Sequence, residues 1–140
     1  MLRISKKDTD LSFTENEAVT IIKYALDNPD YHNLAIATLI TTGLRAGELL
    51  ALKPSDVQIE FGRLIVDKME VTKSYEIVDR CKDDSNGIVY LNSDAKLILS
   101  KVLELRNCEK SECEFLFLNH SSDYDKMHLR AIDNRIRKLQ

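Results

Sequence analysis

Arg45 and Glu48 are the residues whose types and spacing most clearly suggest chemistry. They lie in the stretch TTGLRAGELLAL, residues 41–52, which predicts a helix ending at Gly43 and a short helix after it. An arginine in the first turn of a helix meets the positive end of the helix dipole, which disfavours it. The planar guanidinium, however, matches two phosphate oxygens at once, and free amides at a helix start also bind anions. The pattern therefore suits a phosphate site, with Glu48 orienting Arg45.

An ordinary surface ion pair would explain the same two residues. Arg45 and Glu48 are three residues apart on one helical face, where opposite charges stabilise a helix by a few tenths of a kcal/mol. The local pattern alone leaves both interpretations open.

Composition places the chain among globular proteins. Its 140 residues suffice for one domain, and 44% hydrophobic and 31% charged residues are typical of folded chains. No apolar run approaches the ~20 residues of a membrane span, and the N-terminal residues lack the apolar core of a signal peptide. Three irregularly spaced cysteines suit a reducing compartment. We therefore expect a cytoplasmic single domain over residues 1–140, with residues 1–12 as a polar arm or interdomain linker.

Positive charge is concentrated near the C-terminal end of the sequence. The net charge is −3, yet residues 126–140 carry five basic residues and one acid. A basic segment in an otherwise acidic chain is a candidate nucleic-acid contact. Three residues of this segment, with one lysine from the middle of the chain, are the candidate DNA-binding residues: Lys73, Lys126, Arg130 and Arg135.

The first part of the chain predicts three helices. TENE, residues 14–17, is a capping-box pattern ahead of a helix that should end near Pro29. Residues 31–42 contain LAIATLI, which is apolar on nearly all sides and predicts a buried central helix capped by Gly43. The third helix is short and ends before Pro54.

The hydrophobic period then changes from helical to alternating. Residues 57–66 predict a β-hairpin, residues 69–77 a longer strand, and IVYL at residues 88–91 a further strand. Asn92 or Ser93 caps another helix, and a final helix covers the basic segment. We therefore expect a mostly helical α+β fold: three N-terminal helices, a small three- or four-stranded antiparallel sheet, then helices.

The stretch TGLRAGELLALKPSDV resembles the first conserved box of the tyrosine recombinases, the phage-integrase family. Its Thr, Gly, Leu, Arg, Gly, Glu, Leu and Leu stand at the family's spacing. In that family the box follows a buried helix and precedes a small sheet, as expected here. LSFTENEAVTIIKYAL also resembles the start of the family's catalytic domain, so the resemblance covers residues 11–140.

The resemblance implies DNA strand exchange, as in phages and mobile elements. Such enzymes cut one strand with a tyrosine, form a 3′-phosphotyrosine and free a 5′-hydroxyl, without metal or nucleotide cofactor. Two arginines clamp the scissile phosphate, and the first corresponds to Arg45, which would stabilise the charge of the transition state. Glu48 corresponds to the acidic residue that supports this arginine. Double-stranded DNA is the implied partner, on which the complete protein would self-associate.

A lysine on the family's sheet protonates the leaving oxygen, and two residues are candidates for this role. Lys82 lies just before the strand IVYL, where the family places the lysine, but Asp83 and Asp84 follow it and would raise its pKa and repel phosphate. Lys73 on the preceding strand is the alternative. Lys82 could also be an ordinary solvated loop charge.

The second half of the family's pattern has no counterpart in this sequence. The His-x-x-Arg box and the tyrosine nucleophile are missing, since His128 and Arg130 are two residues apart and the five tyrosines all lie too early. The resemblance therefore implies the first part of a catalytic domain that is inactive by itself. A non-catalytic DNA-binding or protein-interaction module of the same fold is the first alternative function. A helical regulatory domain is the second.

Cysteine and histidine residues near the C-terminal end could suggest zinc. The spacing of Cys108, Cys113, His120 and His128 is unusual for a zinc site, so we expect free thiols and no metal.

Overall fold

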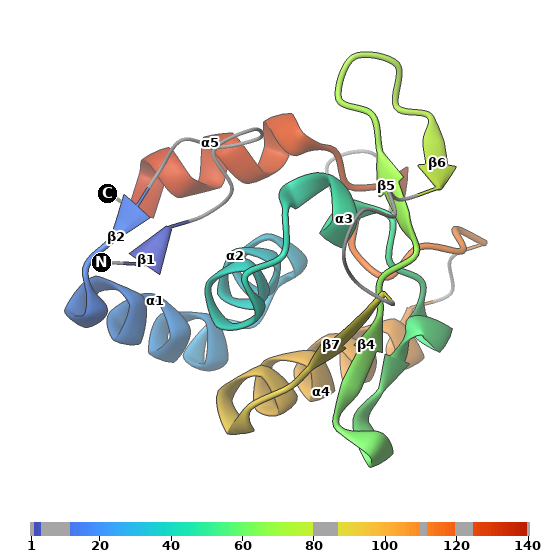
Figure 1. Cartoon of the computed structure of the whole chain (residues 1–140). Helices are drawn as coiled ribbons and strands as arrows, with labels where there is room; N and C mark the ends of the chain where they lie inside the picture. Colours follow the sequence, from blue (N-terminus) through green and yellow to red (C-terminus); the bar gives the residue numbers. More distant parts are fainter. Residues whose placement is uncertain (1, 4–11, 80–86, 110–111, 120–124, 140) are drawn as a thin grey trace.

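Five α-helices and several short antiparallel strands make up the described part of the chain, which Figure 1 shows as a computed structural model. The structure describes residues 2–3, 12–79, 87–109, 112–119 and 125–139. The helices are α1 (Glu15–Asp27), α2 (Tyr31–Thr42), α3 (Ala46–Leu50), α4 (Ser93–Cys108) and α5 (Leu129–Leu139), with 3-10 helices η1 (Pro54–Asp56) and η2 (Ile59–Phe61). The strands are β1 (Leu2–Arg3), β2 (Ser12–Phe13), β3 (Val57–Gln58), β4 (Arg63–Ile65), β5 (Lys68–Glu70), β6 (Ile77–Asp79), β7 (Ile88–Tyr90), β8 (Leu118–Asn119) and β9 (Asp125–Lys126).

The capping box predicted at residues 14–17 starts α1. Thr14 Oγ1 accepts a hydrogen bond from the Glu17 amide (3.1 Å), and Glu17 Oε1 accepts one from the Thr14 amide (2.9 Å). This second bond, from the backbone of Thr14, is the main cause of a Glu17 pKa below its ordinary value. Two of the free amides of the helix start are thus satisfied.

Helix α2 is the buried central helix that the sequence predicts. It is surrounded by the other helices in Figure 1, and its apolar residues Leu34, Ala35, Ile36, Ala37 and Leu39 are fully buried. Asp30 caps its start by accepting a hydrogen bond from the Asn33 amide (2.7 Å). Gly43 ends it in the left-handed conformation (φ 73°), and its amide donates to the Leu39 carbonyl (3.0 Å).

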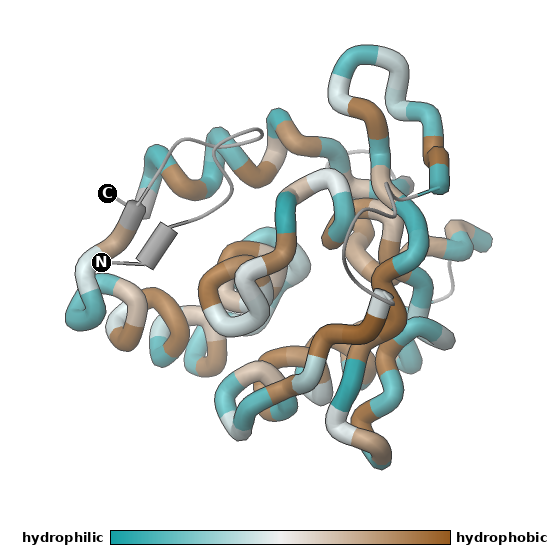
Figure 2. Tube along the Cα trace, in the orientation of Figure 1, coloured by the Kyte–Doolittle hydropathy of each residue, from teal (hydrophilic) through white to brown (hydrophobic). Residues whose placement is uncertain are grey.

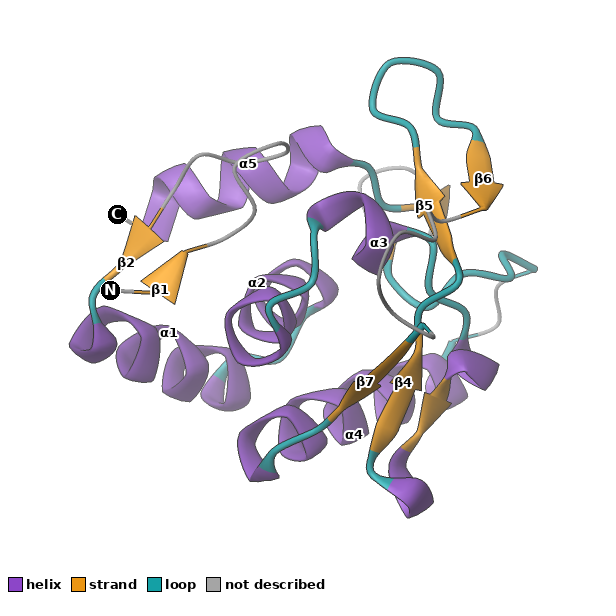
Figure 3. Ribbon diagram, viewed as in Figure 1, coloured by secondary structure: helices purple, strands orange, loops and turns teal. Residues whose placement is uncertain are grey.

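The main sheet has three antiparallel strands in the order β3-β4-β7. Leu64 on the middle strand pairs with Val57 on one side and Val89 on the other. Figure 3 shows this sheet beside α4. The hairpins β5–β6 and β8–β9 form two further two-stranded sheets, and β1 pairs with β2. The mostly helical α+β fold with a small antiparallel sheet is therefore confirmed.

The prediction of one strand over residues 69–77 is wrong. Strand β5 ends at Glu70, the chain turns, and it returns as β6. Two backbone hydrogen bonds close the turn, from Val71 to the Glu76 carbonyl and from Tyr75 to the Val71 carbonyl, both 2.8 Å. Tyr75 adopts a positive φ of 59°. The alternating pattern thus comes from two paired strands rather than from one.

The core lies between α2 and the elements around it. Figure 2 shows hydrophobic segments gathered along α2 and on the inner sides of its neighbours. The buried cluster includes residues from α4 and α5, notably Ile98, Leu99, Val102, Ile132 and Ile136. Among the described residues, no helix is long and apolar enough to cross a membrane.

Candidate functional site

Arg45 stands at the junction between α2 and α3. It is the N-cap residue of α3, with an extended backbone (φ −75°, ψ 150°), so it lies one residue before the first turn in which the sequence placed it. Its carbonyl accepts the first hydrogen bond of the helix, from the Leu49 amide (3.0 Å). Its side chain is exposed, and the guanidinium makes no hydrogen bond or ion pair with any residue that the structure describes. The backbone of Arg45 is therefore fixed by the helix start, while its guanidinium is free to bind an anion.

Glu48 supports Arg45 through the main chain. Its Oε1 accepts a hydrogen bond from the Arg45 amide at 3.0 Å, and only 9% of the residue is exposed. A carboxylate at the third position of a helix that binds the N-cap amide satisfies a free donor and stabilises the helix start. The sequence predicted an interaction of Glu48 with the arginine, and the structure places it on the backbone rather than on the guanidinium.

Helix α3 rests directly on strand β5. A Cβ atom added to Gly47 would lie 2.8 Å from the Glu70 carbonyl oxygen, closer than Cβ atoms approach in proteins. Glycine at this position therefore permits the contact. The backbone of β5 at Glu70 therefore packs directly against the helix that follows Arg45.

The two candidate lysines differ in what the structure describes of them. Lys73 lies in the turn between β5 and β6, not on a strand as predicted, and its side chain is exposed. Lys82 falls outside the described residues. The described chain resumes at Gly87, immediately before β7.

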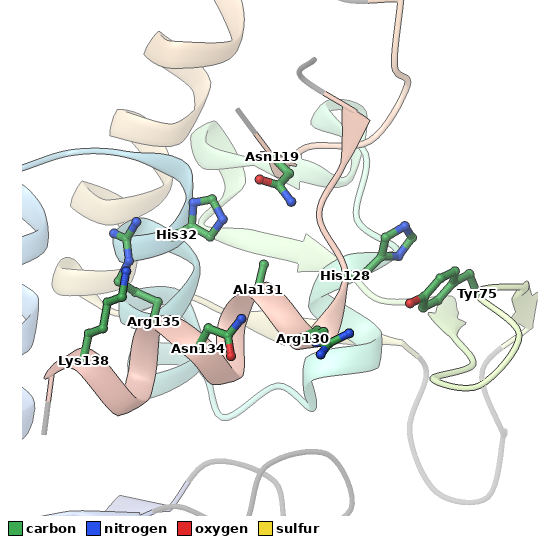
Figure 4. A pocket seen from close by; sticks show the side chains of 9 residues that line it. All are labelled: His32, Tyr75, Asn119, His128, Arg130, Ala131, Asn134, Arg135 and Lys138. Carbon is green, nitrogen blue, oxygen red and sulfur yellow. The ribbon is translucent and has the colours of Figure 1, made fainter. Parts of the chain in front are cut away.

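A basic pocket of about 400 Å³ lies along α5 (Figure 4). Most of its side chains come from α5, and Tyr75 from the β5–β6 turn lies beside His128. Three of the lining residues, Arg130, Asn134 and Lys138, are exposed and follow one another at four-residue spacing. The lining residues are His32, Tyr75, Asn119, His128, Arg130, Ala131, Asn134, Arg135 and Lys138. Its cations give the pocket the charge that binds anions.

Arg135 is engaged inside the protein. Its Nη1 donates to both carboxylate oxygens of Asp30 (3.2 and 2.9 Å) and to Asn33 Oδ1 (2.8 Å). Because Asp30 caps α2, this contact ties α5 to the start of the central helix. Within the candidate DNA-binding set, Arg130 is exposed, whereas Arg135 already has protein partners.

Lys126 is also engaged, by a buried acid. Its Nζ lies 2.5 Å from Glu70 Oε1, and its side chain is 12% exposed. Burial lowers the pKa of Lys126, and the hydrogen bond and charge of Glu70 partly oppose this. Lys126 also lies over the Phe115 ring, 5.1 Å from its centroid.

His128 completes the cluster around Glu70. Its Nδ1 donates to the same Oε1 atom at 3.0 Å, since an ionised carboxylate can only accept. Its ring stacks on Tyr75, with 3.9 Å between centroids and 18° between planes. Among the described residues, no group of three or more His, Cys, Asp or Glu could hold a metal.

Comparison with known proteins identifies the family of this chain. The model of the phage integrase family matches residues 12–140. The chain belongs to the phage integrase family. No curated protein sequence matches it.

Solved structures share the fold of this integrase-family chain. XerA recombinase is 24% identical, with a TM-score of 0.66 over 94% of this chain and 42% of the other. The Tn1549 transposon integrase, in complex with circular intermediate DNA, is 22% identical, with a TM-score of 0.70 over 94% and 46%. A lambda integrase tetramer bound to a Holliday junction is 17% identical, with a TM-score of 0.52 over 99% and 34%. The chain thus spans less than half the length of these solved chains.

The sequence of this integrase-family chain did not predict the cluster that Glu70 forms with Lys126 and His128. The strand predicted over residues 69–77 gave no sign that Glu70 is buried, yet only 2% of Glu70 is exposed. Its partners, Lys126 and His128, are 56 and 58 residues away, so no local pattern connects them.

Proposed function

We propose that this chain forms part of a DNA strand-exchange site in which Arg45 binds a backbone phosphate. The observation that carries the proposal is the geometry of Arg45: its backbone is fixed by Glu48, and its exposed guanidinium has no partner in the described chain. A guanidinium held in this way can grip two phosphate oxygens and stabilise the charge that develops during strand cleavage. Membership of the phage integrase family supports this chemistry.

The other members of the proposed site have separate roles. Lys82 is proposed to protonate the leaving oxygen, with Lys73 as the alternative. Arg130 is proposed to contact the DNA backbone, because it is exposed on the basic side of α5. Lys126 and Arg135, which have protein partners, would act by holding α5 in place. No metal or nucleotide cofactor takes part in the proposed reaction.

Double-stranded DNA is the proposed partner, and self-association on DNA is proposed for the complete protein. The solved Tn1549 transposon integrase is in complex with circular intermediate DNA, and the lambda integrase is a tetramer bound to a Holliday junction. The proposed origin of the protein is a phage or another mobile element. The proposed location is the cytoplasm. The tyrosine nucleophile is proposed to come from outside these 140 residues, so the chain alone binds DNA without cutting it.

Equilibrium binding to a DNA duplex tests the phosphate contact. We expect weak, salt-dependent binding by the chain, with Kd in the nonspecific range of ~10⁻⁴ to 10⁻⁶ M. Arg45→Ala should weaken binding about fivefold and reduce the salt slope by about 1. Lys23→Ala is the matched control, because Lys23 is an exposed cation on α1 without a partner in the described chain. Equal effects of both variants would contradict a specific role for Arg45, and tight site-selective binding by the chain would contradict the affinity expected.

A further inference from the structure

Glu70 is a buried carboxylate that connects segments far apart in the sequence. Its side chain is 1% exposed, and its Oε1 accepts hydrogen bonds from Lys126 Nζ and His128 Nδ1. Strand β5 carries Glu70, whereas its two partners lie on β9 and just before α5. One carboxylate oxygen thus holds the β5–β6 hairpin against the base of α5.

The burial of this charge calls for an explanation. Glu70 Oε2 is buried as well and has no hydrogen-bond partner in the described structure. An ionised carboxylate in the protein interior is costly, and a well-packed apolar side chain is often at least as stable. Charged pairs have directional hydrogen bonds that apolar contacts lack, so they define the relative position of two elements more narrowly.

The backbone of the same residue supports Arg45's helix. The Glu70 carbonyl oxygen lies 2.8 Å from the position that a Cβ atom on Gly47 would take. Gly47 follows Arg45 by two residues, and Arg130 follows His128 by two residues. Helices α3 and α5 also contact each other. Glu70 therefore touches the start of both helices, with its carbonyl on one side and its carboxylate on the other.

The aromatic stack strengthens the connection to α5. Tyr75 keeps a positive φ of 59°, which a non-glycine residue adopts only where the surroundings hold it there. Its ring lies flat on His128, and its amide is bound by the Val71 carbonyl. The turn of the hairpin and the carboxylate of Glu70 thus hold His128 from two sides.

We propose that Glu70 is a positioning residue that fixes the helix starts carrying Arg45 and Arg130 relative to each other for DNA binding. The proposal rests on the function proposed above. Removing the negative charge while keeping the shape, as in Glu70→Gln, should release the start of α5 and leave the rest of the core intact, including the contact of the Glu70 carbonyl with α3. The effect of Glu70→Gln on DNA binding should depend on the presence of Arg45 and Arg130, the two arginines that Glu70 positions.

Amide hydrogen exchange and DNA binding of the full chain test this proposal together. Glu70→Gln should accelerate exchange at the start of α5, leave exchange at the start of α3 unchanged, and weaken DNA binding about fivefold. The double variant Glu70→Gln/Arg130→Ala should bind DNA more weakly than the wild type by a factor clearly smaller than the product of the factors of the two single variants. Ile98→Val is the control for general destabilisation, because Ile98 is fully buried on α4. If exchange at the start of α5 in Glu70→Gln matches that in this control, the proposal is overturned.

A second variant covers the case in which Glu70→Gln does not fold. His128→Phe keeps a ring for Tyr75 to stack on and removes the bond to Glu70, so it should also accelerate exchange at the start of α5. Unchanged protection there would overturn the proposal. If Arg45→Ala and Arg130→Ala leave DNA binding unchanged, the proposed function fails, and hydrogen exchange still decides whether Glu70 positions the helices.

Discussion

The Arg45 amide donates a hydrogen bond to the Glu48 carboxylate across 3.0 Å, while the Arg45 guanidinium remains exposed. The amide of Arg45 thus supports the helix start, and the guanidinium is left for the phosphate contact proposed above. The ion-pair interpretation needs the guanidinium to contact Glu48, and the structure has no such contact. The side chain can therefore be changed without removing the bond that starts α3.

We expect Arg45→Lys to be nearly as damaging as Arg45→Ala in a recombinase that contains this chain together with a tyrosine nucleophile. Lysine keeps the charge but loses the planar fork that binds two oxygens. Losing one such donor costs on the order of 3 to 4 kcal/mol, or a factor of hundreds in cleavage rate. The thermal midpoint should barely change, because the altered side chain is exposed and the Arg45 amide keeps its hydrogen bond to Glu48. Near-normal cleavage by the lysine variant would show that Arg45 does not bind the scissile phosphate through two oxygens.

The chain alone should form no covalent adduct with DNA. The proposed cleavage needs a tyrosine nucleophile, and the family resemblance implies a position for it after all five tyrosines of this sequence. Tyr31, for example, is 1% exposed, and Tyr75 is stacked on His128. A suicide substrate that traps phosphotyrosine, followed by denaturing electrophoresis, is the measurement. An adduct mapped to any of Tyr24, Tyr31, Tyr75, Tyr90 or Tyr124 would show this expectation to be wrong.

Gly47→Ala should destabilise the protein by about 1 to 3 kcal/mol, because the added methyl group overlaps the Glu70 carbonyl. Gly43→Ala is a useful comparison. Nothing lies within 4 Å of its added carbon, so its cost comes from the positive φ of 73° alone. Gly43→Asn should therefore recover part of that loss, whereas no side chain should be tolerated at position 47. Urea unfolding measures all three variants, and a neutral Gly47→Ala would contradict the close contact of α3 with β5.

The capping box of α1 should make stability depend on acid. The Glu17 pKa is lower in the folded chain, first because of the hydrogen bond from the Thr14 backbone, so its ionised form favours folding. This contribution is complete above the unfolded pKa and is lost as the pH falls through the folded value. Between about pH 5 and pH 3, unfolding free energy should fall more steeply in the wild type than in Glu17→Gln. Parallel slopes would contradict the folded-state bond.

Local signals predicted the helices well. The start of α1, the burial of α2 and its end at Gly43 depend on residues within one or two turns of each other, so the sequence displays them directly. The hairpin was harder, because two paired strands produce the same alternation as one long strand. Its turn is closed by backbone bonds at Val71 and Tyr75, which leave no distinctive residue type in the sequence.

The candidate site was predicted in part. The sequence predicted a contact between Arg45 and Glu48 but not that it uses the backbone of Arg45, and the role of Arg45 at a phosphate stays a prediction. Lys126 and Arg135 were predicted from charge alone, and charge does not reveal whether a cation is already bound by an acid. Their partners, Glu70 and Asp30, are 56 and 105 residues away.

The contact between Arg135 and Asp30 determines the rotational phase of α5. A helix packed only by apolar side chains can turn about its axis at modest cost, whereas α5 is anchored by a charged contact in its second half and by His128 just before its start. Turning by one residue, about 100°, would break both anchors. The stripe formed by Arg130, Asn134 and Lys138 is therefore kept facing outward, and it winds by about 80° around the helix axis from Arg130 to Lys138. A long rigid molecule lying along α5 would meet these three side chains in a fixed order and direction.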